Sequence, residues 1–171
     1  MSHFAEEVVK TLAAKKLTLT TVESCTGGGL ANAITDIPGA SEIFKQGFVV
    51  YCNEAKIRLA RSVDETGAWA RTMERQIAEY SVYSFEVARE MAAVGMRGTG
   101  ASVSVGVTGS LSRVDPANAA ASKVGEVYVY ILFRDETPAV KKLVKTTCQG
   151  RPGAKSDVID EIMVLLLGAL A

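Results

Sequence analysis

Apolar residues change their spacing several times along the first third of the chain, and each change predicts a helix or a strand. Helical spacing over residues 4–15 predicts an amphipathic helix. Apolar residues alternate with threonines over 17–22, which is typical of a strand. A helical segment follows at 30–35. A second strand is expected over 46–51 and a helix over 53–60.

The rest of the chain continues this pattern and then changes to paired strands. Residues 64–98 are expected to be mostly helical, with an interruption near 80–84. A small, polar segment over 109–122 predicts a loop. The last helix is expected from residue 154 or 156 to the end. Further strands are expected over 101–107, 125–133 and 140–147, the last two forming a hairpin.

Strands alternate with helices in the first half, and strands follow one another in the second. This order predicts an α/β fold, a three-layer α/β/α sandwich with a mixed sheet. The 171 residues are 48% apolar and 22% charged, which fits one domain over 1–171 with its own core. Lys and Arg together number 19, as do Asp and Glu, so no basic excess points to a nucleic-acid partner.

Targeting signals are not evident in the printed sequence. The first 16 residues lack the uninterrupted apolar core of a signal peptide. The longest apolar run, 162–171, is too short to span a bilayer and is expected to be a buried helix, so no membrane role is expected. We therefore expect a cytoplasmic protein. The apolar last helix also suggests a homo-oligomer.

Cysteine and histidine usage limits the chemistry. Cys25, Cys52 and Cys148 are widely spaced and form no C-x-x-C pair, so neither a disulfide framework nor a metal site is expected. The only histidine is His3, near the terminus. A nucleophile activated by histidine is therefore not expected, and a lysine or carboxylate base is favoured. No cofactor is predicted.

The stretch 23-ESCTGGG-29 lies where a strand ends and a helix begins. Ser24 and Cys25 would lie at the carboxyl end of the strand, where open α/β sheets place their ligands. Thr26 is expected to cap the helix, with Gly27 and Gly28 allowing the turn. Free N–H groups there would suit a phosphate or carboxylate. The alternative is a strand–helix turn without a ligand.

The stretch 51-YCNEAK-56 contains a lysine at an unfavourable position. If Asn53 caps the helix, Lys56 takes the place where helices prefer Glu or Gln. Burial and a helix N-terminus both disfavour an ammonium, so both would lower the pKa of Lys56 and make it a general base. Tyr51 could hydrogen-bond to this lysine or to a substrate. The alternatives are a solvated surface lysine and a packed aromatic residue.

Two further residues have a structural and a functional interpretation. Ser41 follows a Pro-Gly turn and is expected to cap a short helix over 41–44. Arg151 lies in a glycine-rich loop before the last helix, where a guanidinium can bind an anion. The alternative for Arg151 is an ordinary surface arginine.

Together, ESCTGGG, 38-PGASEIFKQGFVVYCNEAK-56, GVTG at 106–109 and the late Gly-Arg resemble the C-terminal domain family of the competence/damage-inducible protein CinA. That family includes nicotinamide-nucleotide amidohydrolases, which convert nicotinamide mononucleotide (NMN) to nicotinic acid mononucleotide and ammonia. The resemblance covers nearly the whole chain and is most specific over 23–56. It implies a small-molecule pyridine nucleotide as substrate and a serine–lysine mechanism without metal.

The resemblance also implies roles for individual residues. By spacing, the family's nucleophilic serine falls on Ser41, its lysine on Lys56 and its tyrosine on Tyr51. The serine of ESCTGG falls on Ser24 and the late arginine on Arg151. Backbone N–H groups near Ser41 or the glycine turn would hold the oxyanion. Thr26, Gly27, Gly28 or Arg151 would hold the 5′-phosphate.

The chain departs from the family pattern in three places. After GVTG the family continues with a glycine-rich turn, whereas this chain has 110-SLSRVDP-116, which introduces Arg113. The late Gly-Arg lacks the family's acidic neighbour, and 66–84 is longer than expected. These departures leave two alternatives to an NMN amidohydrolase: a CinA-like protein that binds a nucleotide or partner without catalysis, and an amidase for another small amide.

Overall fold

The computed structural model describes residues 3–147 and 150–171, so Cys148 and Gln149 lie outside the described residues. Five strands form one mixed sheet in the order β2-β1-β3-β4-β5. Strand β1 runs parallel to β2 and β3, whereas β4 is antiparallel to β3 and to β5. The strands are β1 (Leu19–Glu23), β2 (Phe44–Val49), β3 (Val103–Ser110), β4 (Glu126–Phe133) and β5 (Val140–Lys145).

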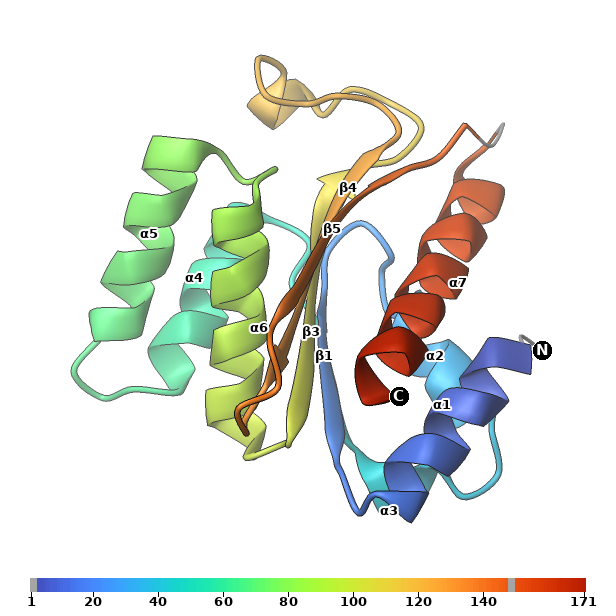
Figure 1. Ribbon diagram of the computed structural model, residues 1–171. Coiled ribbons are helices and arrows are strands. Elements are labelled where there is room, and N and C mark those ends of the chain that lie inside the picture. Colours follow the sequence, from blue (N-terminus) through green and yellow to red (C-terminus); the bar gives the residue numbers. More distant parts are fainter. Residues whose placement is uncertain (1–2, 148–149) are drawn as a thin grey trace.

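Helices cover both faces of the sheet (Figure 1), which confirms the predicted three-layer α/β/α architecture. One layer holds α1 (His3–Ala14), α2 (Gly29–Thr35) and α7 (Arg151–Leu170). The other holds α4 (Asn53–Ser62), α5 (Ala68–Tyr80) and α6 (Phe85–Thr99). The short helices are α3 (Ala40–Ile43), before β2, and the 3₁₀ turn η1 (Pro116–Asn118), between β3 and β4.

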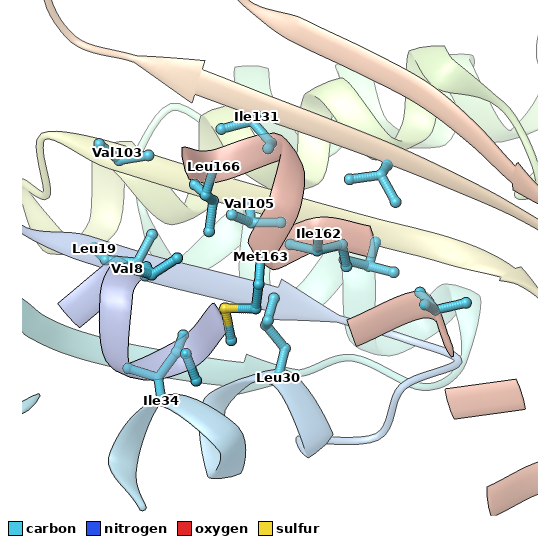
Figure 2. Packing of buried hydrophobic residues seen from close by; sticks show 14 of the residues in the cluster. Val8, Leu19, Leu30, Ile34, Val103, Val105, Ile131, Ile162, Met163 and Leu166 are labelled. Atoms are coloured by element: carbon cyan, nitrogen blue, oxygen red, sulfur yellow. The ribbon is translucent and has the colours of Figure 1, made fainter. Parts of the chain in front are cut away.

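Each face of the sheet has its own hydrophobic core. Figure 2 shows the larger one, in which residues of α1, α2 and α7 pack on β1, β3 and β4. The smaller core joins α4, α5 and α6 to Val22 of β1. Because helices cover both faces, all eight residues of the central strand β3 are buried. No helix in the described part of the chain is both long and apolar enough to cross a membrane.

Most predicted elements are present, with shifted ends. The interruption of the long helical segment separates α5 from α6, and the hairpin of β4 and β5 is confirmed. Strand β2 begins at Phe44, inside the predicted short helix, and β3 continues three residues beyond the predicted end at 107. Helix α7 begins at Arg151 because Pro152 suits a first turn, where the missing N–H is not needed. Arg151 is therefore a helical residue rather than a loop residue.

Close packing of α6 on β3 depends on Gly106. A Cβ atom added at Gly106 would lie 2.0 Å from the Ala88 carbonyl oxygen and 2.8 Å from the Ala92 nitrogen. Both are backbone atoms of α6, so the helix would have to move away from the sheet. The same strand supplies residues 109 and 110 to the candidate site described below. A change in this contact would therefore disturb both the core and the site.

We predict that Gly106→Ala lowers the free energy of unfolding by about 3 kcal/mol or prevents folding, because an overpacked core cannot relax against backbone. Urea unfolding followed by circular dichroism measures this. Gly168→Ala is the matched control, since nothing lies within 4 Å of its added Cβ in α7. It should stabilise the protein by up to about 1 kcal/mol. Equal stabilities of the two variants would contradict the packing argument.

Candidate active site

The carboxyl ends of the parallel strands β1, β2 and β3 meet at one edge of the sheet, beside a cavity of ≈ 460 Å³. Open α/β sheets place their ligands at this edge. Five segments supply the wall: the turn after β1, the residues from Tyr51 to Lys56, the loop after β3, the connection between α5 and α6, and the start of α7.

Lys56 forms the most unusual contact of this cavity. Its side chain is 1% exposed, although lysine is rarely buried without an ionic partner. Its Nζ donates to Val50 O at 2.9 Å and lies 3.1 Å from Ser24 Oγ. Both neighbours are uncharged, so the amine is held by hydrogen bonds alone. The structure thus places a lysine amine against a serine hydroxyl at the base of the cavity.

The direction of the helix explains how Lys56 reaches these partners. Helix α4 is capped by Cys52 rather than by Asn53 as predicted, so Lys56 is the fourth helical residue and not the third. Helical side chains point back towards the N-terminus of their helix. The Lys56 side chain therefore reaches past the first turn to Val50, just after β2, and to Ser24, just after β1. Lys56 therefore does not occupy the position where Glu or Gln is preferred, as predicted, but it still lies in the first turn, near the positive end of the helix dipole.

Burial lowers the pKa of Lys56 from its usual 10.5 to about 8. Removing water from the ammonium is the main cause. Acidic groups around the cavity, including Asp115 and Glu54, oppose this change without overcoming it. Burial also raises the pKa of the neighbouring Cys25 thiol to about 12, so this cysteine stays protonated and is a poor nucleophile. About a tenth of Lys56 is therefore a neutral amine at pH 7, far more than at its usual pKa, and a general base must be neutral.

Ser24 is held in place by the strand ends around it. Its backbone N–H donates to Val107 O of β3 at 3.0 Å, and its carbonyl accepts from Gly27 N at 3.0 Å in a tight turn. The residue is 6% exposed and lines the cavity. Ser24 was expected to bind substrate. Its contact with Lys56 gives it the geometry of an activated nucleophile.

The predicted pairing of Ser41 with Lys56 is not formed. Ser41 is exposed on α3, which precedes β2, and it does not line the cavity. Lys56 follows the other end of β2, and Figure 1 shows α3 at the end of the sheet away from the cavity loops. Six residues of strand span about 20 Å, so two positions close in sequence lie at opposite ends. Ser24, rather than Ser41, is therefore the serine beside the lysine.

The Glu23 carboxylate binds the N–H groups at the glycine turn that were expected to be free for a ligand. Its buried carboxylate accepts hydrogen bonds from the backbone N–H groups of Gly28, Leu30 and Ala31 at 2.8–3.0 Å, so it occupies the N-terminus of α2. Gly28, with φ +89°, is the N-cap in place of Thr26.

This arrangement leaves no anion site at the turn. Thr26, Gly27 and Gly28 do not line the cavity. The hydroxyl of Thr26 is buried without a partner among the described residues. A phosphate there would compete with the Glu23 carboxylate for the same N–H groups. The three predicted phosphate contacts are therefore not supported.

Tyr51 and Arg151 come together at the cavity, although 100 positions separate them. The Arg151 guanidinium donates to the Tyr51 hydroxyl, and its carbon lies 5.9 Å from the centre of the tyrosine ring. Tyr51 is 59% exposed, so this pair lies at the mouth of the cavity rather than at its base. Both residues are thus placed where a substrate can touch them.

Sequence reasoning missed a further group of cavity residues. The Tyr83 hydroxyl donates to Asp115 Oδ2 at 2.7 Å, and this carboxylate also accepts from the Asn118 side chain and from Ala117 N. These bonds keep the pKa of Asp115 below its usual value. They also tie the loop after β3 to the connection before α6. Asp115 before Pro116 was a detectable signal for a capped turn.

The cavity contains no recognisable metal site. Within residues 3–147 and 150–171, no three His, Cys, Asp or Glu side chains are grouped so that they could hold a metal ion. The reactive groups that the cavity does bring together are a serine hydroxyl and a buried lysine amine.

The fold and site define an α/β protein with a serine–lysine pair at the carboxyl ends of parallel strands. The family model described as CinA C-terminal domain matches residues 1–166. The chain belongs to this family, as the sequence motifs predicted.

Curated relatives agree with this assignment. The chain is 40% identical over 104 residues to a CinA-like protein of Chloroherpeton thalassium, covering 61% of this chain and 22% of the relative. It is 37% identical over 109 residues to nicotinamide-nucleotide amidohydrolase PncC of Escherichia coli, covering 64% of this chain and 60% of PncC. The chain thus spans less than two thirds of either relative.

Solved structures of the CinA superfamily share the fold. A Klebsiella pneumoniae CinA superfamily protein has a TM-score of 0.82 at 23% identity, covering 98% of this chain and 95% of that one. A competence or damage-inducible protein of Enterobacter asburiae has a TM-score of 0.77 at 26% identity, covering 99% of this chain and all of that one.

We predict that burial of Lys56 makes stability depend on pH above 8. Between its folded pKa of about 8 and its usual 10.5, the unfolded chain binds a proton at this lysine that the folded chain does not. The free energy of unfolding should therefore rise with pH across this interval, by about 3 kcal/mol in total, and the penalty should be complete below pH 8. Lys56→Met should lack this rise.

The measurement is urea unfolding of both proteins at pH 7, 9 and 10.5, reported as the difference between them. Other titrating groups are the same in both chains, so they largely cancel. A difference that stays constant over this range would show that Lys56 keeps its ordinary pKa in the folded protein.

Proposed function

We propose that this protein is an amidohydrolase that hydrolyses the carboxamide of nicotinamide mononucleotide to nicotinic acid mononucleotide and ammonia. The observation that carries the proposal is the 3.1 Å contact between buried Lys56 Nζ and Ser24 Oγ at the cavity. The likeness to PncC supplies the substrate. Ser24 takes the nucleophilic role that the resemblance had assigned to Ser41.

In the first half of the reaction, Ser24 Oγ attacks the carboxamide carbon while the neutral Lys56 amine accepts the hydroxyl proton. The C–O bond forms as the carbonyl π bond opens, giving a tetrahedral oxyanion. The backbone N–H of Cys25, which lines the cavity and is not among the groups bound by Glu23, is proposed to stabilise it. Collapse of the intermediate breaks the C–N bond, and Lys56 returns its proton to the leaving nitrogen, which departs as ammonia.

In the second half, water hydrolyses the acyl ester on Ser24. The Lys56 amine is again neutral after ammonia has left, so it can accept a proton from the attacking water. Collapse of the second tetrahedral intermediate breaks the ester bond, and Lys56 protonates Ser24 Oγ. The products are a carboxylate and a restored serine. Hydrogen bonding to Val50 O holds the amine in place throughout both halves.

Arg151 is proposed to bind the 5′-phosphate at the cavity mouth. Its guanidinium makes a charge-assisted contact with phosphate oxygens in good geometry. Tyr51, which accepts a hydrogen bond from Arg151, would orient that guanidinium and contact the ribose or phosphate. This assignment keeps the phosphate away from the α2 N-terminus, which Glu23 already occupies.

A second candidate function comes from the loop after β3, which departs from the family pattern and lines the cavity. A changed wall can select another small amide or retain a nucleotide without turnover. Ammonia release measured with a panel of amides alongside NMN distinguishes another substrate from binding without turnover. Turnover of a different amide would move the substrate assignment, and saturable NMN binding without ammonia release would leave a binding protein.

We predict that Ser24→Ala and Lys56→Ala each lower ammonia release from NMN by at least about a thousandfold, because each removes one member of the reacting pair. Ser41→Ala is the matched control. It removes the same hydroxyl from an exposed position outside the cavity and should keep wild-type activity. Coupled ammonia assays and circular dichroism of all three variants provide the comparison. Loss of activity in Ser41→Ala, with Ser24→Ala active, would restore the original assignment.

We also predict that kcat/KM rises with pH and levels off above about 8, because Lys56 must be neutral to accept a proton and its pKa is lowered to about 8. Below that value the rate should fall about tenfold per pH unit. Chromatographic detection of nicotinic acid mononucleotide between pH 6 and 9.5 measures the profile. A flat profile over this range would exclude Lys56 as the titrating base.

A further inference from the structure

Arg113 is the residue that the family pattern does not anticipate, and it lines the cavity. It lies in the loop between β3 and η1, away from the helix that carries Arg151. Arg113 and Arg151 therefore line the same cavity from separate parts of the chain. The mechanism proposed above uses only Arg151.

Neither guanidinium forms a salt bridge with a described residue. Within residues 3–147 and 150–171, no carboxylate lies within salt-bridge distance of Arg113 or Arg151. The Asp115 carboxylate, in the same loop, makes hydrogen bonds to other residues. It accepts from the Tyr83 hydroxyl, the Asn118 amide and Ala117 N. The described residues thus give neither arginine a salt bridge, although the carboxylates of Glu54 and Asp115 also line the cavity.

The backbone at Arg113 is also fixed rather than loose. Ser110 Oγ donates to Arg113 O at 2.9 Å, and Ser122 Oγ donates to Ser110 Oγ at 2.8 Å. Ser122 Oγ in turn accepts from Asp115 N at 3.1 Å. These bonds anchor the residues on both sides of Arg113 to the end of β3. A side chain on such an anchored backbone can contribute to binding with a smaller loss of conformational entropy.

We propose that Arg113 is a specificity-determining residue which, together with Arg151, binds the phosphate monoester of the substrate as a dianion. This inference rests on the proposed amidohydrolase function. A phosphate monoester carries close to two negative charges at neutral pH, because its second pKa is about 6. Two guanidiniums can each make a charge-assisted contact with such a dianion, and a second contact strengthens binding over one arginine alone. The ligand class is a nucleoside 5′-monophosphate, with the corresponding nucleoside rejected.

The test compares NMN with nicotinamide riboside, which has the same carboxamide but lacks the phosphate. Steady-state kinetics are measured for the wild type, Arg113→Ala, Arg113→Lys and the control Arg97→Ala. Arg97 is an exposed arginine at the end of α6, outside the cavity. Melting temperatures of all variants establish that the loop change has not unfolded the protein.

In Arg113→Ala, KM for NMN should rise roughly ten- to a hundredfold, the effect of losing one charge-assisted hydrogen bond. Its kcat, and its kinetics with the riboside, should stay near wild type. KM of Arg113→Lys for NMN should lie between those of the wild type and Arg113→Ala, since lysine keeps the charge but lacks the planar guanidinium. Arg97→Ala should behave as wild type. An equal change for both substrates, or no change for NMN, would overturn the role of Arg113.

A binding experiment separates this inference from the proposed reaction. Calorimetric titration with ribose 5-phosphate measures the anion site without turnover. Binding that weakens in Arg113→Ala, in a protein that releases no ammonia from NMN, would support the two-arginine site and remove the amidohydrolase function. NMN turnover with wild-type KM in Arg113→Ala would support the amidohydrolase function and overturn the two-arginine site. Failure of the wild type to bind ribose 5-phosphate and to turn over NMN would overturn both.

Discussion

The contact of the Lys56 amine with Ser24 Oγ and Val50 O is the constraint on which the rest of the site depends. It joins the ends of two parallel strands to the start of one helix. Val50 N donates to Glu23 O at 2.8 Å, so the two strand ends are already tied together where the lysine docks. Burial of an amine with only neutral partners opposes folding at neutral pH. The packing of α4, α5 and α6 on the sheet must offset that cost.

Glu23 shows how one short stretch serves the fold and the site at once. Its buried carboxylate is stabilised by three N–H groups of the α2 N-terminus, so a second uncommon buried group is held within one residue of Ser24. The bonds fix where β1 ends and how the chain turns, and thereby where the serine hydroxyl points. They also use the donors that a phosphate would need. The phosphate contacts that we propose are therefore made by side chains at the cavity mouth.

The sequence predicted the layers, the mixed sheet and the order of elements well, because these depend on apolar spacing and on turn residues. It also predicted a buried Lys56 with a lowered pKa, which the structure has, whereas its role as the base remains a proposal. It could not predict the partner of Lys56. Ser41 is 15 positions from Lys56 and Ser24 is 32, yet strand direction places Ser41 at the far end of β2. The strand predicted over 46–51 already separates Ser41 from Lys56, but only the parallel pairing of β1 with β2 brings Ser24 beside the lysine, and spacing along the chain does not show that pairing.

The floor of the cavity and its wall near Arg113 are held in place by different interactions. The floor consists of strand ends and the start of a helix, held by backbone hydrogen bonds and by both cores. A substitution there would therefore also destabilise the fold. The wall near Arg113 is a loop held by hydroxyl and carboxylate hydrogen bonds, and beyond Leu111, which belongs to the larger core, its residues lie outside both cores. Substitutions in that loop can alter charge at the cavity mouth while Ser24 and Lys56 stay in contact. We therefore propose that the departure of residues 110–116 from the family pattern affects which ligand is selected, while Lys56 and Ser24 are in contact in this chain.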